Sequence, residues 1–364
     1  MNSWIKGKLS PIYLFWALII LLVGLLIVEQ TKFVQPTSYY TEQIQAAQLM
    51  KSSLEAIKED RLKRNIPLDT GFDPNQTGII GKEYTELTTT LGNLEAKRTS
   101  TNPAFAALLV KYFKEANLKK GEVIAIGASG SFPGLILATL SAVKALELEP
   151  LPIYSIGSSE YGANIPEFTF VEMLDGLNEK NIIPYKLLAI SMGGYLDQAE
   201  GMFYPDSRGI IEKIAQDSGA YFINLDNIEE NIQYRMQLYK KTVDDRPIKA
   251  FVNIGGATPN YGNTPASITY PNGLVINGPK VPDHPERGLI FEYQNLGIPI
   301  IHLLNIRGLA VKNGLPIDPI PLPEIGEGGV YWRIACNKYI IILLIALEFL
   351  YLFWALVKRR INYS

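Results

Sequence analysis

The sequence predicts an α/β protein whose mainly parallel, layered sheet of about six strands is Rossmann-like and lies between two transmembrane helices. Apolar, β-rich segments recur along the middle of the chain, and helical patterns separate most of them. Strands of a parallel sheet have this composition because crossover helices cover both of its faces. The third observation is an apolar stretch of membrane-spanning length near each end of the chain.

The two apolar stretches predict a two-pass cell-membrane protein. Residues 12–28 contain no charge, and residues 339–357 contain a single one. Lys6 and Lys8 precede the first stretch and residues 358–360 are basic, so the positive-inside rule predicts that both termini are cytoplasmic. No small-residue cleavage pattern follows the first stretch, which favours a retained anchor over a cleaved signal peptide. The domain between the stretches is therefore expected to be extracytoplasmic.

The region after the first stretch has the pattern of an amphipathic helix. Ala47, Met50, Leu54 and Ile57 recur at helical spacing, which predicts a stalk helix that packs on its own domain. Packing against a second copy, and hence a homo-oligomer, remains an alternative. We predict a cytoplasmic N-terminus at 1–11, a transmembrane helix at 12–28, the stalk helix at 29–66, an extracytoplasmic α/β domain at 67–338, a transmembrane helix at 339–357 and a basic cytoplasmic tail at 358–364.

Composition and missing motifs exclude several classes of function. The chain is 47% hydrophobic with a formal net charge of −2, so it has enough apolar residues for a core but no basic field for nucleic acid. The glycine patterns that hold dinucleotides and nucleoside triphosphates are absent, and no cofactor is expected. Cys336 is the only cysteine and the two histidines are far apart, so no metal site is expected either.

The loops that follow four of the predicted strands are rich in Gly, Ser and Asn. Parallel strands place their carboxyl ends at one edge of a sheet, where ligands bind in open α/β folds. The strands are expected at 122–126, 152–156, 187–190, 221–225, 249–254 and 299–304, and the loops at 127–133, 157–164, 191–194 and 255–262. Such loops present main-chain N–H groups to a ligand and favour an anion. The candidate binding residues are Lys97, Arg98, Ser129, Gly130, Ser131, Ser158, Ser159, Asn164, Ser191, Gly193, Thr258 and Asn260.

Nucleophilic catalysis is a second hypothesis for the same loops. Ser191 stands at a strand end in a sequence that differs from the nucleophile elbow only in its first glycine, and Ser129 and Ser131 are further candidates. His284 is the candidate base, because His302 lies inside an apolar strand. Asp197, Asp226 or Glu160 could orient His284, and nothing in the spacing selects among these three carboxylates. A non-catalytic protein is favoured, and an amide hydrolase or transpeptidase is the enzyme alternative.

Glu348 lies near the middle of the second apolar stretch. An acidic group there disfavours insertion by roughly 2 to 3 kcal/mol, which a membrane partner would relieve. The partner could be the first span, a second copy or another membrane subunit, and the alternative is a protonated, unpartnered side chain.

Several short motifs resemble one bacterial family. They are residues 81–85, 88–92, 96–103, 127–133, 158–164 and 255–262, and together with both anchors they resemble the poly-γ-glutamate system protein family. The resemblance implies a protein that accompanies the membrane synthase which makes and exports poly-γ-glutamate. It implies no particular catalytic residue.

The expected function is therefore that of a membrane-anchored accessory protein that binds emerging poly-γ-glutamate in its extracytoplasmic α/β domain. The expected partners are the poly-γ-glutamate synthase membrane complex, the polyanionic polymer and the lipid bilayer. Chain synthesis itself needs ATP, and the chain has no recognisable nucleotide cradle. One alternative is a serine hydrolase or transpeptidase that trims or attaches the polymer. Another is a non-catalytic scaffold that braces the synthase.

Overall fold

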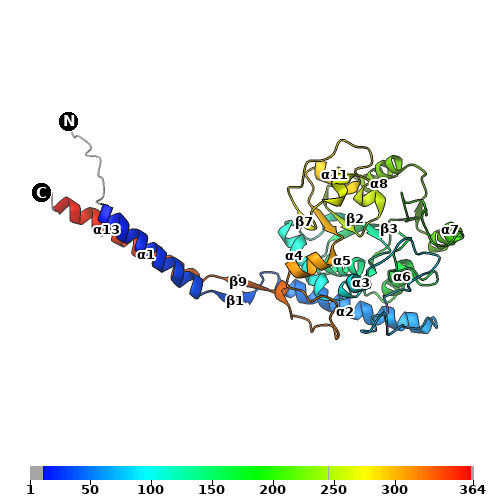
Figure 1. Ribbon diagram of the computed structural model, residues 1–364, viewed down its shortest axis with the longest axis horizontal. Helices are drawn as coiled ribbons and strands as arrows, with labels where there is room; N and C mark the ends of the chain where they lie inside the picture. Colours follow the sequence, from blue (N-terminus) through cyan, green and yellow to red (C-terminus); the bar gives the residue numbers. More distant parts are fainter. Residues whose placement is uncertain (1–10, 245, 362–364) are drawn as a thin grey trace. The chain divides into compact units, whose positions relative to one another are not determined.

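A computed structural model describes residues 11–244 and 246–361 of the chain (Figure 1). The described residues divide into two compact units, one formed by residues up to Thr37 and from Trp332 onward, the other by Ser38–Tyr331. The basic residues Lys6 and Lys8, used above to predict orientation, lie outside the described residues.

The terminal unit consists of two long apolar helices and a short β-ribbon. Helices α1 (Pro11–Gln30) and α13 (Lys338–Ile361) lie side by side (Figure 1). Both are long and apolar enough to cross a membrane, and few of their side chains are buried. Strand β1 (Phe33–Pro36) pairs antiparallel with β9 (Trp332–Ala335), a ribbon that the sequence analysis did not predict.

The helix predicted over 29–66 is shorter in the structure. Residues 33–36 are extended, and the helix, α2, spans Tyr40–Lys63. Its predicted apolar face is buried, and α2 packs along α4 (Ala104–Glu115) and α5 (Pro133–Ala145). Residues 33–36 do not join the helix because Pro36 has no main-chain N–H and disfavours the helical conformation of the residue before it.

The globular unit contains a mainly parallel seven-stranded sheet. Its strand order is β5-β4-β3-β2-β6-β8-β7, and only the β7–β8 pair is antiparallel. The strands are β2 (Val123–Ser129), β3 (Glu149–Ser155), β4 (Ala189–Ser191), β5 (Tyr221–Ile223), β6 (Ile248–Ile254), β7 (Gly273–Val275) and β8 (Ile300–Leu303). The six predicted strands are all present. The missed strand, β7, begins at Gly273 and pairs antiparallel at the edge of the sheet, outside the alternation of apolar strands and helices from which the other strands were predicted.

Helices cover both faces of this sheet (Figure 1). Residues of α2, α4, α5 and α6 (Phe170–Glu179) bury one face, whereas α8 (Ile228–Thr242) and α11 (Leu289–Asn295) bury the other. Along β2, Ile124 and Ile126 join the first of these cores and Ala125 joins the second, as the two-residue period of a strand requires. The remaining helices are α3 (Leu94–Thr99), α7 (Ser207–Ser218), α9 (Thr258–Tyr261), α10 (Pro265–Ile268), α12 (Ile306–Lys312) and the 3₁₀ turn Gly329–Tyr331.

The strand order places a topological switch point between β2 and β6. From β2 the chain builds β3, β4 and β5 successively to one side, and then returns to add β6 on the other side of β2. Loops leaving β2 and β6 therefore lead away in different directions, and such a divergence opens a crevice at the carboxyl edge of the sheet.

Candidate functional site

A cavity of about 540 Å³ lies at the carboxyl edge of the sheet, at this switch point. Loops after β2, β3, β4 and β6 contribute to its wall, together with the segment from Thr89 to Lys97. Its lining includes Thr90, Gly92, Lys97, Ser129, Ser131, Phe132, Ser155, Gly157, Ser159, Gly193, Glu200, Gly256 and Thr258. The four loops singled out in the sequence thus meet around one space.

Lys97 reaches this cavity from the short helix α3. The Asn93 side chain caps α3 by accepting a hydrogen bond from the Ala96 main-chain N–H at 2.9 Å. The Lys97 side chain is only 2% exposed, although its amine lines the cavity. Among the described lining residues, Lys97 is the cationic side chain and Glu200 the acidic one.

The amine of Lys97 is surrounded by serines and an aromatic ring. Its Nζ contacts the main-chain oxygen of Ser131, lies 2.6 Å from Ser159 Oγ, and sits 4.2 Å from the centre of the Phe132 ring. Burial lowers the pKa of Lys97 to about 7, and the Glu160 carboxylate opposes this shift only in part. Near neutral pH the amine therefore exists in both its charged and its neutral form.

Three serines form a hydrogen-bonded chain beside this amine. Ser129 Oγ donates to Ser131 Oγ at 3.0 Å, and the Ser159 main-chain N–H donates to the same Ser131 oxygen at 3.0 Å. All three serines line the cavity. The loop after β2 is thereby tied to the loop after β3, and the hydroxyl of Ser159 is directed to Lys97.

The segment around Ser159 is held on both sides by main-chain hydrogen bonds. Thr89 N donates to Ser158 O at 2.8 Å, and Glu160 N donates to Thr90 O at 3.0 Å. The Glu160 carboxylate accepts a hydrogen bond from Gly92 N at 2.7 Å. This pairing between distant segments fixes the main chain on each side of Ser159.

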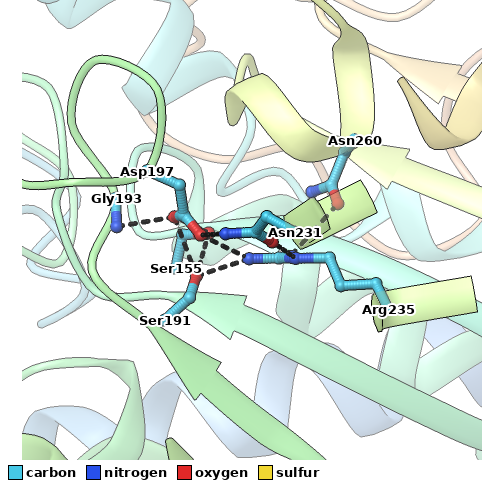
Figure 2. A network of polar contacts seen from close by, with 7 residues as sticks. All are labelled: Ser155, Ser191, Gly193, Asp197, Asn231, Arg235 and Asn260. Atoms are coloured by element: carbon cyan, nitrogen blue, oxygen red, sulfur yellow. Dashed lines mark hydrogen bonds and ion pairs between the residues drawn. The ribbon is translucent and has the colours of Figure 1, made fainter. Parts of the chain in front are cut away.

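A fully buried polar network lies beneath the loops after β3 and β4 (Figure 2). Arg235 Nη2 and Asp197 Oδ2 form an ion pair at 2.7 Å, and both side chains are 0% exposed. Ser191 Oγ donates to Asp197 Oδ1 at 2.9 Å and accepts from Arg235 Nη2 at 2.7 Å. Ser191 is therefore saturated with partners, and it is not among the residues that line the cavity.

The network joins four parts of the fold (Figure 2). Ser155 Oγ at the end of β3 lies 2.9 Å from Ser191 Oγ, and Gly193 N donates to Asp197 Oδ1 at 2.8 Å. Asn231 on α8 donates to Asp197 Oδ2 at 3.0 Å, and Asn260 on α9 accepts from Arg235 at 3.4 Å. Because Ser155 and Gly193 also line the cavity, the network supports its wall from below.

Three of the predicted binding residues pack the loops together. Asn164 is buried, accepts from Lys82 N at 2.9 Å and donates to Lys82 O at 2.7 Å. The Ser158 hydroxyl donates to the Ser159 main-chain oxygen at 2.9 Å. A Cβ atom on Gly130 would lie 2.7 Å from the Ile156 main-chain oxygen, so this glycine allows two loops to approach each other.

Arg98 and the two histidines lie apart from the cavity wall. Arg98 pairs with Asp318, its Nε lying 2.7 Å from Asp318 Oδ1, although it is adjacent to Lys97 in sequence. His284 is exposed, and its Nδ1 accepts from Glu286 N at 3.1 Å. His302 is buried beside Asn253, and burial lowers the pKa of His302 to about 4. Neither histidine contacts a candidate serine in the described residues.

Glu348 lies on the face of α13 that meets α1. Tyr351 donates to the Tyr13 main-chain oxygen at 3.1 Å, and a Cβ atom on Gly24 would lie 3.5 Å from Leu344. Residues spaced by four and by seven positions share one face of a helix, so Glu348 lies between these two contacts. Its Oε2 atom is buried and has no hydrogen-bond partner among the residues that the structure describes.

Several cavity residues were not predicted from the sequence. They are the wall from Thr89 to Asn93, together with Tyr195 and Glu200. The wall precedes the first strand of the sheet, so the rule that locates sites at strand ends does not find it. The Arg235–Asp197 pair carried no sequence signal either, because its two residues lie 38 positions apart.

The chain was compared with protein-family models, with curated proteins and with solved structures, and none of the three comparisons found a match.

Proposed function

We propose that this protein is a membrane-anchored accessory component of poly-γ-glutamate synthesis and export, and that it binds the emerging polymer in the cavity at the carboxyl edge of its sheet. The observation that carries the proposal is Lys97, a buried amine that opens into a cavity walled by hydroxyl-bearing and glycine-rich loops.

The chemistry of the cavity suits a γ-linked glutamate chain. Each residue of that polymer has a free carboxylate and an amide N–H. The Lys97 ammonium pairs with a carboxylate, and hydrogen bonds between charged partners are stronger than neutral ones. The Glu200 carboxylate, also in the lining, accepts an amide N–H, and the hydroxyl of Thr258 serves either group.

The size of the cavity fits a short segment of chain. A volume of about 540 Å³ falls within the range of roughly 300 to 1,000 Å³ that is typical of small-ligand pockets. A long polymer that offers the same unit many times would gain affinity from repeated rebinding of successive segments. One site per protein is thus sufficient for retention.

Helices α1 and α13 supply the membrane anchor in this proposal. Both have the length and apolar composition of membrane-spanning helices. The basic residues that flank them in the sequence support cytoplasmic termini and an extracytoplasmic domain. The synthase complex is the proposed partner, because the polymer must pass directly from its site of synthesis to the binding site.

Binding of a short fluorescent γ-glutamyl oligomer to the full-length protein in detergent tests the proposal. Fluorescence anisotropy should give a dissociation constant at least about tenfold larger for Lys97→Met than for the wild type. A charge-assisted hydrogen bond contributes roughly 1.5 kcal/mol or more to the free energy of binding. Wild-type affinity should rise as the pH falls through about 7, where Lys97 gains its proton.

Lys119→Met is the matched control. Lys119 is exposed and precedes β2, at the opposite edge of the sheet from the cavity, so its loss should leave the dissociation constant unchanged. An oligomer whose carboxylates are converted to amides should bind weakly to all three proteins. Equal affinity of wild type and Lys97→Met for the acidic oligomer would refute the proposed site.

A further inference from the structure

We propose that Ser159 and Lys97 form a nucleophile and general-base pair that cleaves an amide bond of the bound chain by acyl transfer to water. The identity of the substrate rests on the proposed function, whereas the chemistry depends only on the two side chains. The sequence analysis placed catalysis on other serines and on a histidine, so this pair is a new assignment.

The geometry fits direct proton transfer between the two groups. Ser159 Oγ and Lys97 Nζ are 2.6 Å apart, and both residues line the same cavity. A base must lie within about 2.6 to 3.2 Å of the proton that it removes. Because Ser131 and Thr90 hold the main chain on both sides of the Ser159 hydroxyl, the nucleophile needs no rearrangement to reach its base.

The surroundings of Lys97 favour the neutral amine that a base requires. Its Nζ also contacts the main-chain oxygen of Ser131, to which the amine donates one hydrogen. The lone pair of the neutral amine can then accept the hydrogen of Ser159 Oγ. Desolvated lysines act as bases in this way because burial disfavours their charged form.

Ser159 is better placed than the other serines of the site. Ser191 lies in the buried network, where it already contacts Asp197 and Arg235. Ser131 accepts hydrogen bonds from Ser129 and from the Ser159 main chain, and its own O–H can donate to an oxyanion in the cavity. Ser159 is the serine whose hydroxyl contacts the Lys97 amine.

The reaction balances with water as the second substrate. Ser159 Oγ bonds to the amide carbonyl carbon, and its proton moves to Lys97 Nζ. The carbon–nitrogen bond then breaks, Lys97 returns the proton to the leaving amine, and an ester to Ser159 remains. Water, deprotonated by Lys97, attacks this ester; as the ester bond breaks, Lys97 returns the proton to Ser159 Oγ, so that a carboxylic acid and free Ser159 are released. When Ser159 attacks, an amide carbonyl of the chain lies next to Ser159. In simple binding, a carboxylate of the chain occupies the same position.

A fluorophosphonate probe tests the pair without knowledge of the natural substrate. The serine oxygen bonds to phosphorus, fluoride leaves, and the serine proton passes to the base. With the full-length protein in detergent, mass spectrometry should locate the adduct on Ser159. The labelling rate should rise with pH up to about 7 and then level, because Lys97 loses its proton there.

The variants separate catalysis from binding. Ser159→Ala should abolish labelling but keep oligomer binding, and Lys97→Met should slow labelling by roughly 100-fold or more, the usual effect of losing a general base. Ser52→Ala, an exposed position on α2, is the matched control and should label like wild type. Absence of an adduct, an adduct on another serine, or labelling that does not depend on Lys97 would overturn the pair, and intact oligomer binding would leave the proposed function standing.

A second variant covers the case in which Lys97→Met does not fold. Ser159→Cys, made together with Cys336→Ser, places a single thiol beside the amine. Iodoacetamide should alkylate this thiol several-fold faster at pH 7 than it alkylates the same protein in urea, because a nearby lysine favours the thiolate. Alkylation that is slower in the folded protein would overturn the assignment of Lys97 as a base.

Discussion

At the scale of single residues, the most informative feature is a buried amine that contacts no acidic side chain among the residues that the structure describes. Lys97 is 2% exposed, and the atoms near its Nζ belong to two serines and a phenylalanine ring. A buried charge is costly unless it is paired, so the protein lowers the pKa of the amine instead. Strongly shifted groups that face a cavity are typical of functional sites, because binding and proton transfer both use the shift.

The shift of Lys97 predicts how stability depends on pH. The pKa is about 7 in the folded protein against 10.5 for the ordinary side chain, so the unfolded chain binds more protons between these values. The free energy of unfolding should therefore rise with pH in this window, by at most about 1.4 kcal/mol per pH unit from this group. In Lys97→Met this contribution is absent. Denaturant unfolding of both proteins at pH 7, 8 and 9 should show that the free energy of unfolding of the wild type rises relative to that of the variant. A difference that stays constant with pH would contradict this prediction.

Lys97 and Arg98 are adjacent in the sequence but have different surroundings in the fold. Lys97 enters the cavity, whereas Arg98 pairs with Asp318 on another side of α3. The sequence analysis named both as candidate binding residues. Successive residues of a helix point about 100° apart, and only the packing of α3 decides which of them meets the cavity.

At the scale of elements, the buried network explains how a loop-built wall keeps its shape. Strand β4 has only three residues, and the loop that follows it carries Gly193 at a φ of +76°. A Cβ atom there would lie 2.7 Å from Gly157 N, so the loops after β3 and β4 touch through their main chains. The Asp197 carboxylate beneath them satisfies Gly193 N and anchors the loop to α8 through Arg235.

Breaking the ion pair of this network should be strongly destabilising. Arg235→Met leaves the Asp197 carboxylate buried without its cation, and loss of one partner of a buried pair costs about 3 to 5 kcal/mol. Arg246→Met is the matched control, because its pair with Glu149 is about half exposed and contributes under about 1 kcal/mol. Denaturant unfolding followed by circular dichroism measures both. Similar losses for the two variants would show that the network does not hold the wall.

Some strands of the fold could be predicted from the sequence and others could not. The six parallel strands of the sheet were predicted because each is a short apolar run between helical patterns. Strand β7 and the β1–β9 ribbon were missed, since they pair antiparallel and lie outside the alternation of apolar strands and helices. Such pairing depends on which distant segments the tertiary structure brings together.

At the scale of the whole molecule, the two apolar helices form one unit and the sheet with its helices forms the other. Within the first unit, α1 and α13 contact each other, and Glu348 lies on their shared face. The sequence analysis named the first span, a second copy or another membrane subunit as the partner of Glu348, with an unpartnered side chain as the alternative; in the described residues its Oε2 atom is buried and has no hydrogen-bond partner.

Cys336 provides a direct test of orientation. It is the only cysteine of the chain and is exposed, just before α13. If the globular unit is extracytoplasmic, a membrane-impermeant maleimide should label Cys336 in intact cells. The control, Cys336→Ser with Ser364→Cys, moves the thiol to the predicted cytoplasmic tail and should be labelled only after lysis. The opposite pattern would place the globular unit in the cytoplasm.

The sequence by itself determined the fold class, the two apolar terminal helices and the gathering of four glycine- and serine-rich loops around one cavity. These features follow from local periodicity and from the rule that parallel strands end at a common edge. Only the tertiary structure decided which side chains meet in the cavity and which are enclosed beneath it: Ser191 is enclosed by Arg235 and Asp197, while Ser159 contacts Lys97. The physical reason is that burial and hydrogen-bond partners arise between segments far apart in the chain, and no local pattern records them.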